Sequence, residues 1–288
     1  MALLNTPVPY PGEIWVVVRF LASQSGPVAY DTLRAFLEPH SRESKKLTTV
    51  HYALTTLRSL GLAEVSVEGQ DWVLAGDLAA LPWDDYAAFQ RGLRSAVLGL
   101  RGHQPAETAD DLRRALVWSL TRDPFSESFN WPVVDSRHQR DAPDGELVFV
   151  NDTRWSPFTT WATCLGLGAS APHLAQRYIP DCTLAVRQVL EEYLPPNAPA
   201  DALDVLRLLR EHLPVLPGGV ISNSLGYGLA DDRTVGAALS FALMRGEYEK
   251  WLVLSSDSDA KQPIKVQDPE QSSMRLCSAI ARQEAAHV

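Results

Sequence analysis

The sequence has few cysteines and no long hydrophobic run. Its 288 residues include three cysteines, Cys164, Cys182 and Cys277, which lie far apart in the chain. Their spacing fits neither the close pairs of zinc sites nor an even-numbered disulfide framework. The best apolar stretch, residues 14–21, contains Arg19 and is far shorter than the ~20 residues that cross a bilayer. We therefore expect free thiols in a reducing cytosol, and a cytoplasmic protein with no membrane partner.

Signatures of common catalytic and phosphate-binding sites are also missing. Gly166-Leu-Gly168 lacks the glycine spacing of a phosphate loop, and no G-x-S-x-G nucleophile elbow occurs. The seven histidines form no obvious metal pair, and Asp257 and Asp259 lack the glutamate of a calcium loop. We expect no catalytic residue, no metal site and no cofactor. A third hypothesis, a cryptic enzyme, would need a convergent polar site in residues 123–152.

The charge balance is acidic rather than basic. Lys and Arg number 26 against 35 Asp and Glu, which gives a formal net charge of −9. This excludes a protein whose whole surface coats nucleic acid, although a local basic strip stays compatible with it. With 45% apolar residues the chain can bury a sizeable core, and its length suggests about two domains.

The N-terminal part of the sequence predicts a winged helix-turn-helix. Apolar residues at helical spacing predict helices over about 14–24, 29–37 and 47–60, and Gly61 ends the third. Alternating residues over 63–75, with a turn at Gly69-Gln70, then predict a β-hairpin. Three short helices followed by a hairpin favour a winged-helix domain over residues 1–80.

The third predicted helix is the candidate recognition helix. Its candidate DNA-binding residues, together with the cations just before it, are Arg42, Lys45, Lys46, Thr48, Thr49, His51, Tyr52 and Arg58. The cations suit phosphates, but the helix face is rich in threonine and poor in the donors that read bases. DNA contact and a protein–protein adaptor role both stay open.

The middle segment, residues 81–195, predicts a helical domain. Helices are expected at about 83–100 and 107–120, followed by an irregular loop over 123–145. His138, between Arg137 and Arg140, is expected in this solvated loop, with contact to phosphate as the alternative. Residues 147–150 predict a short strand or an extended run.

An aromatic Arg-Trp motif lies between residues 151 and 168. Phe158, Trp161, Ala162 and Leu165 are spaced as one apolar face of a helix, and Pro157 suits the first helical position. We predict that Trp155, Phe158 and Trp161 pack internally and fix the orientation of the flanking modules. In this structural motif Arg154 is the residue to test for a polar or phosphate contact.

The C-terminal segment, residues 196–288, predicts a second winged-helix-like domain with a terminal helix. Helices are expected at about 201–213, 220–225 and 234–244, and strands at 251–254 and 264–266. A further helix is expected over 272–288. The predicted fold class is therefore mainly α (α+β), with two winged helix-turn-helix modules flanking a central helical region.

The motif N-x-T-R-W-x-x-F-x-x-W-A-x-x-L-G-L-G resembles the DpdG family of bacterial deazapurine-in-DNA gene clusters. The early Leu-Leu-Asn-Thr-Pro and the later Ile-Pro-Asp at 179–181 fit the same resemblance. It implies a non-catalytic subunit of an anti-phage DNA-defence complex, whose partners would be other protein subunits and, as an open alternative, double-stranded DNA. A free-standing winged-helix transcriptional regulator is the competing hypothesis.

Overall fold

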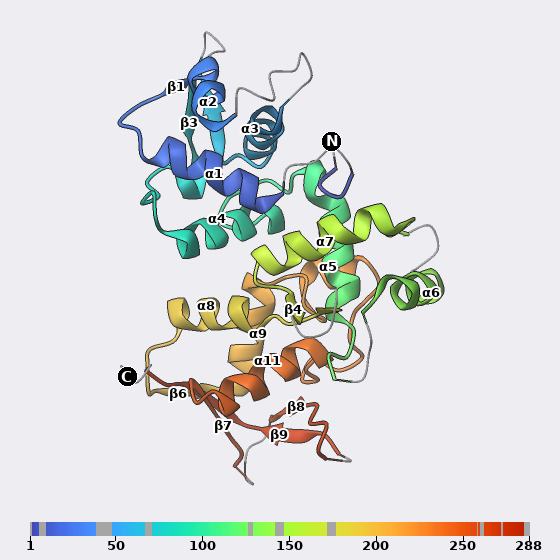
Figure 1. Ribbon diagram of the computed structural model, residues 1–288. Helices are drawn as coiled ribbons and strands as arrows, with labels where there is room; N and C mark the ends of the chain where they lie inside the picture. The colour runs from blue at the N-terminus through green and yellow to red at the C-terminus, as the bar shows by residue number, and fades with distance from the viewer. Residues whose placement is uncertain are drawn as a thin grey trace. The chain divides into compact units, whose positions relative to one another are not determined.

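The chain folds into two compact units. The computed structural model describes residues 2–5, 10–38, 48–66, 71–125, 129–141, 147–171, 177–257, 259, 262–271 and 273–284. The first unit joins Met1–Leu112 to Asp152–Leu165, and the second joins Arg113–Asn151 to Gly166–Val288. Both are built from helices with small antiparallel sheets (Figure 1), as the predicted mainly α (α+β) class requires. The predicted domain boundaries near 80 and 195 stay a prediction.

The first unit begins with three helices and three short strands. In chain order these are α1 (Pro11–Ala22), β1 (Val28–Ala29), α2 (Tyr30–Leu37), α3 (Thr49–Ser59), β2 (Ala63–Val65) and β3 (Asp71–Leu74). The central strand is β3, which pairs antiparallel with β1 on one side and β2 on the other. The three helices and the hairpin expected from the sequence are present. The strand β1 was not predicted, because a strand of two residues is too short to show an alternating pattern.

Local signals in the sequence set the ends of these helices. Pro11 occupies the first turn of α1, and the Glu13 carboxylate accepts a hydrogen bond from the backbone N–H of Tyr10 at 2.9 Å. The Thr48 hydroxyl accepts from the N–H of His51 at 3.4 Å and caps α3. The inward stripes of the two helices, which form much of the core here, are Ile14, Val17, Val18, Leu21, Val50, Leu54 and Leu57.

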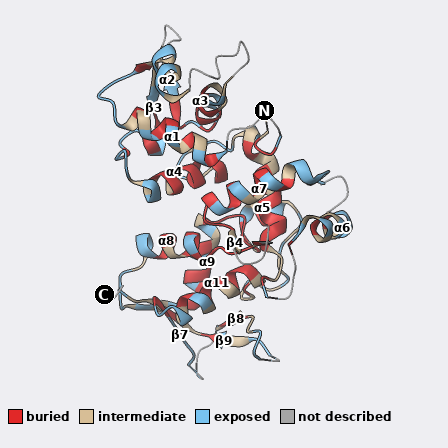
Figure 2. Ribbon diagram, in the orientation of Figure 1, coloured by how far each residue is buried: buried red, intermediate tan, exposed pale blue. Residues whose placement is uncertain are grey.

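Two further helices and the start of a third complete the first unit. They are α4 (Tyr86–Leu98), α7 (Asp152–Cys164) and the first residues of α5 (Asp110–Leu120), preceded by short 3₁₀ turns η2 (Gly76–Leu78) and η3 (Glu107–Ala109). From Phe89 onward α4 is buried along most of its length (Figure 2). The Asp111 carboxylate accepts hydrogen bonds from the N–H groups of Leu3 and Leu4, at 3.2 and 2.8 Å, and so ties the N-terminal residues to α5.

The aromatic motif forms α7, but the helix starts earlier than predicted. It begins at Asp152, so Pro157 lies inside it rather than at its first position. An interior proline removes one backbone hydrogen bond and its ring crowds the carbonyl four residues earlier, so packing around the buried Pro157 has to offset that cost. The predicted apolar face is buried: Phe158, Trp161 and Leu165 are fully inaccessible.

The second unit contains the remaining helices and strands. They are α6 (Trp131–Asp141), β4 (Ala169–Ala171), β5 (Arg177–Ile179), α8 (Thr183–Tyr193), β6 (Pro199–Asp201), α9 (Ala202–His212), α10 (Val220–Ser224), α11 (Ala237–Tyr248), β7 (Leu252–Ser255), β8 (Ile264–Val266), β9 (Arg275–Cys277) and β10 (Ala279–Arg282). Their antiparallel sheets are β6-β10-β7, β4-β5 and β8-β9. Asp201 caps α9 by accepting from the N–H of Leu203 at 2.9 Å.

The loop predicted over residues 123–145 is wrong in part, because α6 lies within it. Asn130 starts this helix by accepting from the N–H of Val133, and Pro132 falls in the first turn, where its missing N–H costs nothing. Only Val134 and His138 form its inward stripe, which is too short to show as a period. His138 is 1% exposed rather than solvated. Residues 147–150, predicted as a short strand or an extended run, are not assigned to a strand.

The strands predicted at 251–254 and 264–266 are present as β7 and β8, but the terminal helix predicted over residues 272–288 is wrong. Residues 275–277 and 279–282 are the strands β9 and β10. The strand β7 pairs with β10, with Leu254 opposite Ile280, whereas β8 pairs with β9. Apolar residues at 274, 276 and 280 fit a helical stripe by spacing, yet Leu276 is 47% exposed and Ile280 is buried. Residues 275–282 form strands because they pair with strands elsewhere in the chain, and a local sequence pattern does not predict such pairing.

Candidate functional site

The outward side of α3 is polar and free of carboxylates. Within Thr49–Ser59 the only charged side chain is that of Arg58. Arg58, Thr49 and Thr55 are exposed, and His51 and Tyr52 are half-buried. A short helix with hydroxyl groups and one cation on its open side can approach a phosphate backbone without repulsion of its own.

Aromatic neighbours hold two of the predicted recognition residues in place. The His51 ring meets the Tyr30 ring edge-on, with 6.4 Å between centroids, and the Tyr52 ring at 5.8 Å. These contacts orient both side chains at the surface of the helix. Thr48 is partly occupied as the helix cap, as described above. Arg42, Lys45 and Lys46, predicted to meet phosphates, lie outside the described residues.

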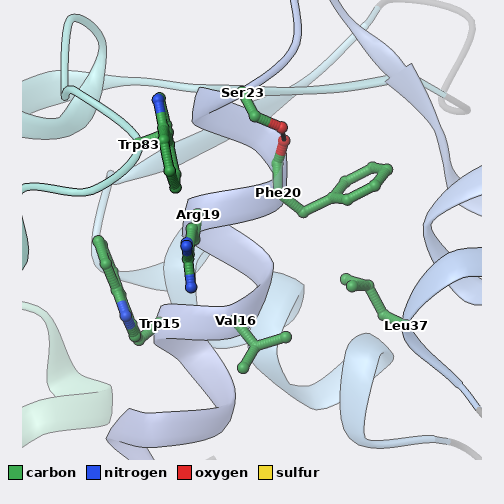
Figure 3. Close-up of a pocket in the computed structure, with 7 residues that line it drawn as sticks. All are labelled: Trp15, Val16, Arg19, Phe20, Ser23, Leu37 and Trp83. Carbon is green, nitrogen blue, oxygen red and sulfur yellow. Dashed lines mark hydrogen bonds between the residues drawn. The ribbon is translucent and has the colours of Figure 1, made fainter.

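A second surface feature of the first unit is an aromatic groove on α1. Its lining residues are Trp15, Val16, Arg19, Phe20, Ser23, Leu37 and Trp83, and its volume is about 520 Å³. Trp83, Arg19 and Trp15 follow one another on one side of α1, and Phe20 and Leu37 lie on the other (Figure 3). The guanidinium of Arg19 lies over the Trp83 ring, 4.8 Å from its centroid. Trp15 in turn meets Tyr86 edge-on at 5.3 Å.

This groove was not predicted from the sequence, although α1 carries a signal for it. Trp15, Val16 and Phe20 lie on α1 outside the stripe that faces the core, so the helix is apolar on more than one side. A helix that is apolar beyond its core-facing stripe indicates a second contact surface. The prediction of α1 depended on its core-facing stripe alone.

The predicted motif residues are placed by packing within the first unit. Trp155 is 8% exposed and its ring lies 5.3 Å from that of Phe158. The end of α7 is held by α4: Gln90 donates a hydrogen bond to the Cys164 carbonyl at 2.9 Å, and Arg94 donates one to the Leu165 carbonyl at 3.1 Å. These contacts pack α7 within the first unit, and the predicted role of the motif in orienting the flanking modules stays a prediction. Arg154 is half-buried, and its charge lies close enough to act on the pKa of Asp111.

A comparison with protein-family models decides the family. The model described as DpdG-like matches residues 1–260. The chain belongs to the DpdG-like family. The family suggests an association with the Dpd defence and DNA-modification cluster. Neither a curated protein nor a solved structure matches the chain.

The three cysteine thiols of this DpdG-like chain are buried. Cys164, Cys182 and Cys277 are all free thiols, and burial raises the pKa of each. A buried thiol with a raised pKa is a poor nucleophile, because the thiolate is the reactive form. Among the described residues, no group of His, Cys, Asp or Glu has the arrangement to hold a metal ion.

The second unit of this family member holds a buried histidine between aromatic rings. His138 meets Trp118 and Phe149 edge-on, with centroids 5.1 and 5.0 Å away. Burial lowers the pKa of His138 to about 4. The guanidinium of Arg122 lies 5.3 Å from the Trp118 ring and donates a hydrogen bond to Asp141 at 2.8 Å. The neutral imidazole is thus a packing residue, and the nearby charges act on its pKa in opposite directions: Asp135 and Asp141 raise it and Arg122 lowers it.

None of the helices described is both long enough and apolar enough to span a bilayer.

Proposed function

We propose that this chain is a non-catalytic winged-helix subunit of a bacterial anti-phage DNA-defence complex, and that α3 contacts double-stranded DNA. One observation carries the proposal: a polar, carboxylate-free helix precedes a β-hairpin, in a domain ordered helix, strand, helix, helix, strand, strand. In winged helices the helix before the hairpin is the one that enters a groove. The sheet order β1-β3-β2 suits this arrangement because it puts the hairpin beside the first strand.

The second unit supports a second winged helix with the same topology. Here α8, β6, α9, α11, β7 and β10 follow the order of the first copy, and their sheet order β6-β10-β7 matches β1-β3-β2. Two additions distinguish it: α10, and the pair β8-β9 between β7 and β10. In this proposal the first helix of the second copy is α8, which precedes β6 as α1 precedes β1.

The two copies differ at the helix that would meet DNA. The counterpart of α3 is α11, which precedes β7 as α3 precedes β2. On α11 the Phe241 ring is met edge-on by Phe125 at 5.1 Å, and Arg245 is paired with Asp181 at 2.6 Å and with Glu249 at 2.7 Å. Because the ring of Phe241 is covered and the charge of Arg245 is already paired, α11 offers few groups that could contact phosphates. We therefore assign DNA contact to α3.

The DNA assignment is tested by the salt dependence of duplex binding. We expect Arg42→Ala, Lys45→Ala and Lys46→Ala, combined, to lower the slope of log K against log salt by about 0.9 for each lost phosphate contact. Arg58→Ala should lower it by the same amount for one contact. Fluorescence anisotropy of a labelled duplex over a salt series measures the slope.

The matched control is Arg207→Ala in α9. Arg207 is exposed and pairs with Asp204 at 3.1 Å, so its loss removes a surface cation of the second unit without touching α3. Its slope should equal that of the unaltered protein. An unchanged slope in both the combined Arg42, Lys45 and Lys46 variant and the Arg58→Ala variant would overturn DNA contact by this face.

The subunit role is tested separately from DNA contact. The tagged protein, purified from cells that carry its neighbouring genes, should bring stable protein partners at fixed ratio through gel filtration. A free-standing regulator would instead elute as a homodimer and give a sharp operator footprint. That result would overturn the subunit proposal and support the alternative, whichever way the α3 variants behave.

A further inference from the structure

The groove on α1 is a surface without an assigned role. It lies outside the stripe of Ile14, Val17, Val18 and Leu21 that faces the core, and of its lining Trp15 also packs against Tyr86 and Phe89 of α4. Val16 in the groove is 50% exposed, and Trp83 at its side is 47% exposed. Phe36 extends the apolar surface: it is 73% exposed and its ring lies 5.5 Å from that of Phe20. Exposed aromatic residues gathered in this way are typical of contact surfaces.

The charge of the groove is uncompensated. Arg19 is the only charged residue of the lining, which contains no carboxylate. Across the described residues, Arg19 forms no ion pair, and its guanidinium contacts the face of Trp83 instead. The stacked ring holds the guanidinium in place while leaving its N–H groups available to an acceptor.

The shape of the groove fits a short helical segment. Its α1 residues, at 15, 16, 19, 20 and 23, extend along the helix over about 12 Å, or roughly two turns. A facing helix would place apolar side chains at i, i+3 or i+4, and i+7 along that length. Nucleic acid would need several cations along its path, and the lining supplies one.

We propose that this groove docks an amphipathic helix of a partner protein, whose apolar residues cover Val16, Phe20 and Leu37 and whose carboxylate pairs with Arg19. Charge complementarity selects the occupant: the cation needs an acceptor, and the aromatic walls need apolar cover. This goes beyond DNA contact by α3 and deepens the proposed subunit role, on which it rests. It names the chemistry of the partner and the residues that meet it.

A displayed library of random helical peptides tests the proposal on the full-length protein. We expect enriched peptides to carry a carboxylate within one turn of two large apolar residues. Selection against Arg19→Glu should replace that carboxylate by Lys or Arg. For a peptide enriched on the unaltered protein, Arg19→Ala should weaken binding about tenfold, the effect of losing one charge-assisted contact.

Val16→Asp should abolish peptide binding, because it places a carboxylate on the apolar floor. Its matched control is Val220→Asp, a change at another exposed valine, 72% exposed in α10 of the second unit, which should bind peptide normally. Circular dichroism melting checks that each variant is folded. Arg58→Ala should also bind peptide normally, so failure of DNA contact and failure of this proposal give different results.

Three outcomes would overturn the proposal. In the first, the library yields no peptide on the unaltered protein that it does not also yield on the Val16→Asp protein. Another is enrichment of apolar peptides whose charge does not reverse on Arg19→Glu. The third is self-association of the chain that Val16→Asp abolishes, since a second copy would then be the occupant.

Discussion

At the scale of single residues, small contacts explain positions that the sequence leaves ambiguous. Gly168 is an example: a Cβ there would lie 2.4 Å from the ring of Tyr178, whose hydroxyl donates to the Leu167 carbonyl at 3.2 Å. The glycine is therefore needed for the close approach of a fully buried ring, whereas Gly166, with φ of +70°, has the left-handed backbone of a helix stop. By residue type alone either glycine could be a helix stop, and the close approach at Gly168 could not be predicted because the ring comes from β5, which pairs with β4.

His138 carries a pH-dependent stability. Burial lowers its pKa from 6.5 to about 4, so the folded state binds the proton less well than the unfolded state does. The stabilisation is complete above about pH 6.5 and is lost as the pH falls toward 4, by up to about 3 kcal/mol. Urea unfolding at pH 7.5 and pH 4.5 measures the change.

The variant His138→Phe isolates this residue. Its ring can keep the edge-on contacts with Trp118 and Phe149, and it has no proton to bind. The variant should lose less stability between the two pH values than the unaltered protein, and the difference is the share of His138. Equal losses would contradict the assignment.

At the scale of elements, β10 organises the C-terminal sheet. It is the middle strand, with β6 on one side and β7 on the other. The N-terminal helices and the β2-β3 hairpin could be predicted because their contacts are local and their periods clear. The strand β10 could not, because β6 lies some eighty residues earlier and no local spacing reports that partnership. The helix α6 was missed for another physical reason: Pro132 reads as a breaker unless its position in the first turn is known.

A proline at Ala281 tests the central position of β10. Ala281 lies opposite Pro199 in β6 and Val253 in β7. Ala281→Pro removes an N–H from the middle of a sheet and should destabilise the protein by about 3 kcal/mol or more in urea unfolding. Ala281→Val, which favours a strand and disfavours a helix, should change stability by less than about 1 kcal/mol. If Ala281→Val strongly lowered the free energy of unfolding and Ala281→Pro left it unchanged, residue 281 would not lie in the middle strand of a sheet.

At the scale of the whole molecule, the same order of helices and strands occurs twice, and the sequence showed this only in outline. Two helices followed by strands were predictable in each half, since apolar periods mark them. The shared sheet order β1-β3-β2 and β6-β10-β7 depends on pairing across long stretches of chain. Of the candidate site, the polar face of α3 was predicted from residue types, whereas the groove of Trp15, Arg19 and Trp83 depends on Trp83 meeting α1, which no spacing reveals.

The discontinuity of the first unit has a consequence for its synthesis on the ribosome. Its chain leaves at Leu112 and returns only with Asp152–Leu165, so α7 is made after about forty residues of the second unit. At a synthesis rate of about 5–20 residues per second, Leu165 follows Leu112 by roughly 3–10 s. During those seconds the nascent first unit lacks Phe158 and Trp161. The apolar surface that these side chains cover in the folded unit is then exposed, and it can aggregate or bind a chaperone.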